Sequence, residues 1–448
     1  MRLRLLQLRD ILRDSFWFIP AVMALAATAL ALSLVSLDHA LGSDWVVNVG
    51  WIWSGGPDGA RSVMATVAGS LMTVISIVFS LTITTLAQTS SHFGPRVLRN
   101  FTSHRGVQFT LGTFIATFVF CLLVLRTVRS VEESQFVPYL AVNVGVLLTL
   151  LSLAVLIYFI HHISQSIQAE RLIADVGREI VEVLPRQFPR VEQSDMRSAE
   201  PSPARWSEAR TLAHGENGYV QHFDLEKLIL EATDADVIVH VQARPGDFVW
   251  SSTPLLRVLP PERVTEAVHD RLVSCFQLSF RRTPRQDPVY SVQQLVEIAA
   301  HALSPGINEP FTAIACIDWL GAALALVAEL DVSPGRRFDQ QGSLRVLVQS
   351  VTFEELAHTA FDQIRLYGAS NTDVMLRLLG VVTALGSRTS RDDVREVLSR
   401  HANLIATDAV HIVNAMDRQR VLEAHQAALS ALAKTSALAQ PVESPGAS

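Results

Sequence analysis

Four stretches near the start of the chain lack charged side chains and are long enough to cross a membrane. They are residues 16–37, 62–88, 106–125 and 136–160. A helix needs about 20 apolar residues to span the ~30 Å hydrocarbon layer of a bilayer. The pattern therefore predicts a membrane α-helical fold class, in which residues 1–160 form a transmembrane domain of four helices.

The arginines between these stretches predict an orientation. Four precede the first stretch and three lie between the second and third, whereas the opposite loops hold arginines offset by acidic residues. Because positively charged loops stay cytoplasmic, we expect both termini and everything after the fourth helix to be cytoplasmic. The arginines on the cytoplasmic side are Arg2, Arg4, Arg9, Arg13, Arg96, Arg99 and Arg105.

The second apolar stretch carries a stripe of hydroxyl side chains. They recur every three or four residues, so they share a helix face about 120° wide at about 100° per residue. Such a stripe serves either close packing against another helix or the wall of a water-filled pathway. The residues that would line a pore are Thr66, Ser70, Thr73, Ser76, Ser80, Thr84 and Gln88.

None of the four stretches has an ionisable side chain in its interior. Ion-coupled carriers and proton relays use such groups at depth, so the pattern leaves passive conduction or no transport. Four helices are few for a pore within one protomer, and a conducting pathway would require a symmetric homo-oligomer. The expected partners are therefore the lipid bilayer, further copies of the chain and, for a channel, ions.

The remaining residues alternate between polar and apolar positions as in a water-soluble α+β domain. Residues 161–184 predict a cytoplasmic helical extension, and 185–217 are proline-rich and predict a linker. Residues 218–260 predict a small β-rich module, with Asp224 as the N-cap of a short helix. Residues 261–439 predict a helical cytoplasmic domain, beginning with one helix over 262–280, and 440–448 a disordered tail.

One helix of this domain, residues 311–330, is apolar enough to resemble a fifth span. Asp318 interrupts it, and a fifth crossing would place the C-terminus outside. We expect a buried central helix.

Composition excludes several functions. The formal net charge is −6, which does not suggest a broad basic surface for nucleic acid. The three cysteines lack CxxC spacing, so no disulfide framework or metal site is expected. The chain has no phosphate-binding loop, no HExxH and no GxSxG motif, and we expect neither a cofactor nor an enzyme.

The segment 285–313 is the densest in special residues. One interpretation is local structure, in which a Ser-Pro-Gly turn separates two helices and Asn308 caps the second, with Glu309 in its first turn. The other is a site for a ligand, a cation or a neighbouring subunit. Its candidate residues are Asp287, His301, Asn308, Glu309 and Asp318.

Three segments carry a resemblance to a known family. They are QDPVYSVQQLVEIAAHALSPGINEPFTA, SSHFGPRVLRNF after the second apolar stretch, and RPGDFV in the β-rich module. Together they resemble a bacterial family of predicted membrane proteins catalogued as domain of unknown function 2254. Glu309 stands where the family pattern has aspartate. The resemblance implies a bacterial inner-membrane location and no established activity.

Two functional hypotheses follow. In the first, the protein is an oligomeric channel or pore-like protein, with the second helix lining the pathway and the cytoplasmic domain serving assembly or gating. The alternative is a membrane-anchored binding or sensing module without transport, whose ligand site lies near 287–318.

Overall fold

The computed structural model describes residues 17–41, 56–93, 105–129, 136–166, 169–187, 201–284, 286–330 and 335–438. Within these ranges the chain forms two compact units, Met1–Arg171 and Leu172–Ser448. Each unit is described by itself below. The disordered tail predicted at 440–448 lies outside the described residues.

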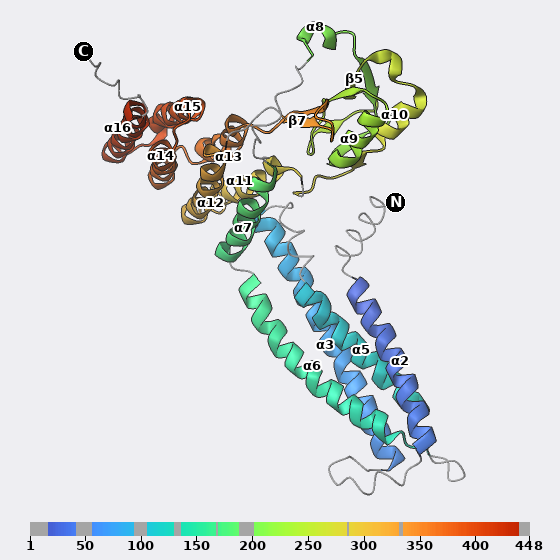
Figure 1. The fold of residues 1–448 in the computed structure, drawn as a ribbon. Coiled ribbons are helices and arrows are strands. Elements are labelled where there is room, and N and C mark those ends of the chain that lie inside the picture. The colour runs from blue at the N-terminus through green and yellow to red at the C-terminus, as the bar shows by residue number, and fades with distance from the viewer. Residues whose placement is uncertain are drawn as a thin grey trace, which may run out of the picture. The chain divides into compact units, whose positions relative to one another are not determined.

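The first unit contains long apolar helices (Figure 1), α2 (Phe18–Leu41), α3 (Pro57–Phe93), α5 (Arg105–Thr127) and α6 (Tyr139–Ser166). They fall on the four predicted stretches, and α3 extends beyond both ends of its stretch. Helix α5 contacts the other three helices, and Phe114 and Phe120 from its buried face fill the interior. Large apolar side chains such as Leu25, Leu147 and Ile157 point outward, as lipid contact requires.

A polar cap joins two of these helices. Asp38, near the end of α2, is almost fully buried and accepts hydrogen bonds from the backbone N–H groups of Leu140 and Ala141, both at 3.0 Å. These groups belong to the first turn of α6, where the N–H groups have no partner within the helix. Asp38 therefore fixes the start of α6 against α2.

Five helices in the described ranges are long and apolar enough to cross a membrane, and the fifth is α12 (Pro310–Ala328). Helix α12 packs in the second unit against α11 (Pro288–Ala302), α13 (Phe353–Tyr367) and α14 (Thr372–Gly386). Ile317, Leu320 and Leu324 on its inner face are buried. On its exposed face, Asp318 forms an ion pair with Arg377 of α14.

The second unit holds two sheets. A five-stranded sheet has the order β1-β5-β3-β8-β7, from β1 (Arg210–Ala213), β5 (Pro254–Leu259), β3 (Ile238–Val241), β8 (Leu344–Val348) and β7 (Gly335–Phe338). A three-stranded sheet has the order β4-β2-β6, from β4 (Phe248–Val249), β2 (Gly218–Phe223) and β6 (Phe276–Ser279). Helices α9 (Leu225–Asp234) and α10 (Glu266–Val273) pack together beside strands of the larger sheet.

The Asp224 cap is confirmed, since its carboxylate accepts from the N–H of Lys227 at 3.0 Å. The single helix predicted over 262–280 is wrong. The segment contains η2 (Pro261–Arg263), α10 and then β6, because Phe276 stacks on Phe223 and β6 pairs with β2. Strand pairing between distant segments overrides the local helical pattern.

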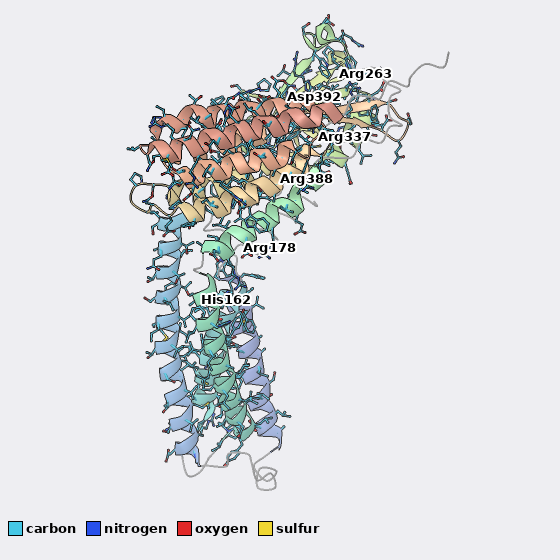
Figure 2. All side chains as sticks on the ribbon, turned by 90° about the vertical axis from the view of Figure 1, so that its left-hand side faces the viewer. His162, Arg178, Arg263, Arg337, Arg388 and Asp392 are labelled. Carbon is cyan, nitrogen blue, oxygen red and sulfur yellow. The ribbon has the colours of Figure 1, made fainter. Side chains whose placement is uncertain are left out.

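Helices α11 to α16 form a layered stack, and strands β7 and β8 lie between α12 and α13 in the chain. Its later members are α15 (Asp392–Asp408), the short η3 (Ala409–His411) and α16 (Ala415–Leu438). Helix α7 (Ala169–Gln187) contacts α12 through Gly177 and the indole of Trp319. The remaining element, α8 (Pro203–Trp206), precedes β1. Figure 2 shows the charged side chains of this unit, with Arg178 on α7 and Asp392 at the start of α15.

Candidate functional site

The hydroxyl stripe lies on the outward face of α3. Every residue proposed to line a pore is exposed in the protomer, namely Thr66, Ser70, Thr73, Ser76, Ser80, Thr84 and Gln88. The buried residues of α3 lie on the opposite side and include Met64, Ala68, Leu71 and Val78. The stripe therefore takes no part in packing α3 against α2, α5 or α6.

Several hydroxyl hydrogens of the stripe are bonded within α3 itself. Ser70 donates to the carbonyl of Val67 at 3.0 Å, Ser76 to that of Met72 at 3.0 Å, and Thr84 to that of Ser80 at 2.9 Å. A hydroxyl that donates in this way keeps acceptor capacity on its oxygen. The face can therefore accept hydrogen bonds from water or from another chain without first losing a bond.

A second set of hydroxyls supplies the polar contacts inside the bundle. Thr110, Thr113 and Thr117 on α5 are buried, and Thr117 is 3.0 Å from the hydroxyl of Ser152 on α6. Helix packing thus uses hydroxyls that were not predicted to do so, although their spacing of three and four residues is visible in the stretch 106–125. The α3 stripe is additional to this packing.

Asp287 stabilises the start of α11. Its carboxylate accepts from the N–H of Tyr290 at 2.9 Å and forms a two-point ion pair with Arg282, at 2.7 and 2.9 Å. The side chain is almost fully buried, and Gly246, with φ +100°, passes so close that a Cβ there would collide with the carboxylate. Capping and ion pairing occupy the hydrogen-bonding capacity that a ligand would use.

The other candidates of this segment occupy separate positions. His301 lies in the last turn of α11, about 20 Å from Asp287 at 1.5 Å per residue. Asn308 is a left-handed turn residue with φ +53°, and the N-cap of α12 is Glu309, so the predicted capping role of Asn308 is wrong. The reason is the turn itself, in which the N–H of Asn308 bonds to the carbonyl of Ser304 at 2.9 Å. Asp318 pairs with Arg377.

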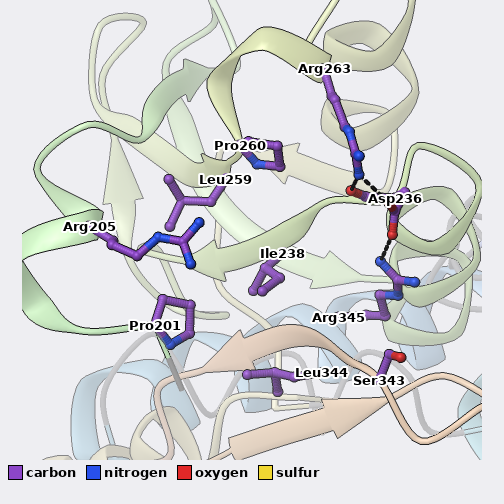
Figure 3. A pocket seen from close by; sticks show the side chains of 10 residues that line it. All are labelled: Pro201, Arg205, Asp236, Ile238, Leu259, Pro260, Arg263, Ser343, Leu344 and Arg345. Carbon is purple, nitrogen blue, oxygen red and sulfur yellow. Dashed lines mark hydrogen bonds and ion pairs between the residues drawn. The ribbon is translucent and has the colours of Figure 1, made fainter. Parts of the chain in front are cut away.

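A shallow pocket of about 370 Å³ opens beside the larger sheet (Figure 3). Asp236 lies on one side, with Arg263 and Arg345 bound to it, and these guanidinium groups hold the pKa of Asp236 below its usual range. Arg205 lies on the other side, beyond Leu259. Arg205 is exposed and, among the described residues, forms no ion pair.

Comparison with known proteins decides the family. Residues 13–384 match the family described as predicted membrane protein (DUF2254). The chain is a member of the DUF2254 family. It is 28% identical over 440 residues to the uncharacterized proteins Rv1290c of Mycobacterium tuberculosis and Mb1321c of Mycobacterium bovis, covering 96% of this chain and 83% of each relative. No solved structure matches the chain.

Membership of DUF2254 confirms the resemblance seen in the sequence and makes this a predicted membrane protein. The match extends over both compact units, so the helical bundle and the sheet-containing unit both belong to the family pattern. The relatives add no activity, and function has to be inferred from the residues themselves.

One cluster in this DUF2254 protein was not predicted from the sequence. His358 and Asp362 on α13 and His401 on α15 bring possible metal-ligand atoms within 4.8 Å of one another. A helix places residues i and i+4 on one face, so the sequence alone could have shown that His358 and Asp362 lie together. The third residue is distant in sequence, and only the packing of α15 on α13 supplies it.

Proposed function

We propose that this DUF2254 protein is an oligomeric channel or pore-like protein of the bacterial inner membrane. The single observation that carries the proposal is the position of the hydroxyl stripe, which runs along α3 on the side away from its own bundle. In a bilayer this face meets lipid, another protein surface or water. A polar stripe of this length favours the last two over hydrocarbon.

The pathway lies between copies of the chain. The bundle interior is filled by side chains such as Met64, Phe114, Phe120 and Phe159, all nearly inaccessible. Because these side chains fill the centre of the described bundle, we place the pathway outside a single protomer. A symmetric homo-oligomer that brings several α3 helices around one axis gives each hydroxyl stripe a common wet interior.

The proposal assigns α2, α3, α5 and α6 as the membrane crossings and α12 as a helix of the cytoplasmic unit. The arginine distribution supports cytoplasmic termini. The cytoplasmic unit serves assembly or gating rather than catalysis. A C-terminal green fluorescent protein fusion should fluoresce and a C-terminal alkaline phosphatase fusion should be inactive; the reverse pattern contradicts this orientation.

Conduction is tested with the purified full-length protein in planar bilayers. Ser76→Leu and Ser80→Leu should each reduce the current, because a bulky apolar side chain narrows and dries the wall. The matched control is Ser33→Leu on α2, since Ser33 is also an exposed serine whose hydroxyl donates to the carbonyl four residues earlier, at 2.8 Å. Silent bilayers under voltage, tension and pH changes contradict the proposal, as does a current that none of the α3 changes alters.

The cysteines of the chain allow a second readout. Cys121, Cys275 and Cys316 are all buried. In a Ser76→Cys variant, a charged methanethiosulfonate reagent should therefore react chiefly at the new thiol and block the current, whereas a Ser33→Cys variant should keep it. Disulfide-linked dimers of the Ser76→Cys variant without any current would show that the stripe is an interface between copies and not a conducting wall.

A second candidate function is a membrane-anchored binding or sensing module. The observation that favours it is the pocket lined by Arg205, whose guanidinium forms no ion pair with the described residues and can bind an anionic ligand. A thermal-shift series with phosphate and carboxylate ligands tests it: Arg205→Gln should erase a response, and Asn308→Ala or Glu309→Ala should erase it only if the ligand binds near the α11–α12 turn.

A further inference from the structure

The cluster of His358, Asp362 and His401 has the composition of a metal site. The Nδ1 atom of His358 lies 3.2 Å from one carboxylate oxygen of Asp362, and the Nδ1 atom of His401 lies 3.7 Å from the other. The two imidazole rings approach edge to face, with centroids 4.9 Å apart. One carboxylate thus faces two imidazoles from two different helices.

His401 is the unusual member of the cluster. Its side chain is fully buried, and neither ring nitrogen has a hydrogen-bond partner. Among the described histidines, it is the one in which both ring nitrogens are buried without a hydrogen-bond partner. Buried polar atoms without a partner cost stability, and in native proteins they call for a specific explanation. The ring packs on Phe361, with ring centroids 5.2 Å apart. This contact explains why the ring is buried, but it gives the two nitrogens no hydrogen-bond partner.

Burial favours a neutral, ligating imidazole at His401. Burial is the main cause that lowers the pKa of His401 to about 4; Asp362 acts in the opposite direction, and His358, Arg365 and Arg400 act with burial. Metals bind the neutral form of histidine. The two arginines are themselves neutralised, since Arg365 pairs with Asp408 and Arg400 with Glu354.

We propose that His358, Asp362 and His401 bind a first-row divalent cation, with Zn²⁺ as the best fit, and that the ion holds α13 against α15. Two imidazoles and one carboxylate are a common ligand set for such ions. Ligand atoms around tetrahedral zinc lie about 3.4 Å apart, given bonds of about 2.0–2.1 Å. The present separations, within 4.8 Å, reach that value by small side-chain rotations.

Two further features support the site. His358 and Asp362 are partly exposed, with 36% and 39% of their side chains accessible, so an ion can enter and a fourth position can hold water. The Nε2 atom of His358 lies 3.6 Å from a carboxylate oxygen of Glu354 and 3.4 Å from Nη1 of Arg400, which itself pairs with Glu354. A carboxylate on the far nitrogen of a ligating histidine orients the ring and strengthens the ligand.

The test measures zinc bound to tag-free, full-length protein in detergent after chelator treatment and dialysis against Zn²⁺. Wild type should bind one ion per chain at this site, and Co²⁺ in its place should give the visible spectrum of a nitrogen- and oxygen-coordinated ion. Asp362→Asn and His358→Ala should abolish this binding. Both residues lie at the surface end of the cluster, so these variants keep the fully buried His401.

The matched control is His269→Ala. His269 also has its Nδ1 atom beside a carboxylate, that of Asp270 at 3.1 Å, but it belongs to no three-residue cluster of possible ligands among the described residues. His269→Ala should bind zinc as wild type does. Zinc should raise the melting temperatures of wild type and His269→Ala and leave that of Asp362→Asn unchanged. Glu354→Gln, which changes a positioning residue, should weaken binding about 10- to 100-fold.

Stoichiometric binding that survives both Asp362→Asn and His358→Ala would place the ion elsewhere and overturn the proposal. Absence of stoichiometric binding in wild type would overturn it equally. The proposal does not depend on conduction, because zinc content and bilayer currents are measured separately. Either result therefore leaves the channel proposal to its own test.

Discussion

Gly177 on α7 provides a sharp test of the packing in the second unit. A Cβ atom at this position would lie closer than 3.0 Å to atoms of the Trp319 ring on α12, a separation that real Cβ atoms essentially never show. The colliding atoms belong to the rigid indole and not to a flexible chain end. Gly177→Ala should therefore push α7 away from α12 or force the indole out of its position.

Two opposing effects determine how much Gly177→Ala changes the stability of the protein. Replacing glycine by alanine inside a helix stabilises by about 1 kcal/mol, and overpacking a core contact costs about 1–3 kcal/mol. Gly380 in α14 has no atom within 4 Å of its added Cβ, so Gly380→Ala shows the first effect alone. Gly321 is intermediate, with a methyl of Val381 at 2.9 Å. Stability should therefore fall in the order Gly380→Ala, Gly321→Ala, Gly177→Ala.

Thermal unfolding of the three variants in detergent measures this order. In a domain of this size about 1 kcal/mol shifts the melting temperature by 2–4 °C, so the first and last variants should differ by several degrees. Combining Gly177→Ala with Trp319→Leu should recover part of the loss. If Gly177→Ala is as stable as Gly380→Ala, the proposed contact between α7 and α12 is wrong.

Three further predictions concern polar contacts. Asp38→Ala should cost about 1–2 kcal/mol by removing the cap of α6, measured by thermal unfolding, with a smaller loss for Asp38→Asn, which keeps one acceptor. Arg244 and Glu355 form a two-point pair at 2.9 and 2.8 Å, and a double-mutant cycle with Arg244→Met and Glu355→Gln should give a coupling of about 1 kcal/mol. Burial raises the pKa of Asp339, but Arg345 and the N–H groups of Ser343 and Gln341 outweigh it, so the pKa lies below its usual value. The resulting stability is present above about pH 4 and lost below it, and Asp339→Asn should be less sensitive to acid between about pH 4 and pH 2.

The apolar helices were predictable because their signal is local. Runs without charge, such as residues 62–88, fix both the presence of a helix and its approximate ends. The cap at Asp224 was predictable for the same reason, since an N-cap bonds to the helix that immediately follows it. Strand β6 was not, because its pairing partner β2 lies far away in the sequence and nothing in residues 262–280 records that pairing.

The candidate sites also differ in how much of each is encoded locally in the sequence and how much depends on tertiary packing. Periodicity located the α3 stripe, but the direction of that stripe depends on which face α5 covers, and this is a tertiary property. At Asp287 the sequence showed a carboxylate before a helix, whereas its strong partner Arg282 emerges only when the preceding loop folds back. His401 is the extreme case, because the proposed metal site exists only after α15 packs on α13.

The direction of the α3 stripe bears on the choice between anchoring and conduction. A helix that only anchors the chain needs one face for its own bundle and apolar side chains elsewhere, as Leu147, Leu150 and Ile157 provide on α6. Helix α3 packs one face on its own bundle, but its outward side combines the hydroxyl stripe with exposed apolar side chains such as Met72, Ile77 and Phe79. Hydroxyls bonded to their own helix cost little when lipid surrounds them, so the bilayer tolerates the stripe without explaining it. A face that accepts hydrogen bonds gains energy where water or a second chain supplies the donors, and the proposed homo-oligomer is one arrangement that brings such donors to α3.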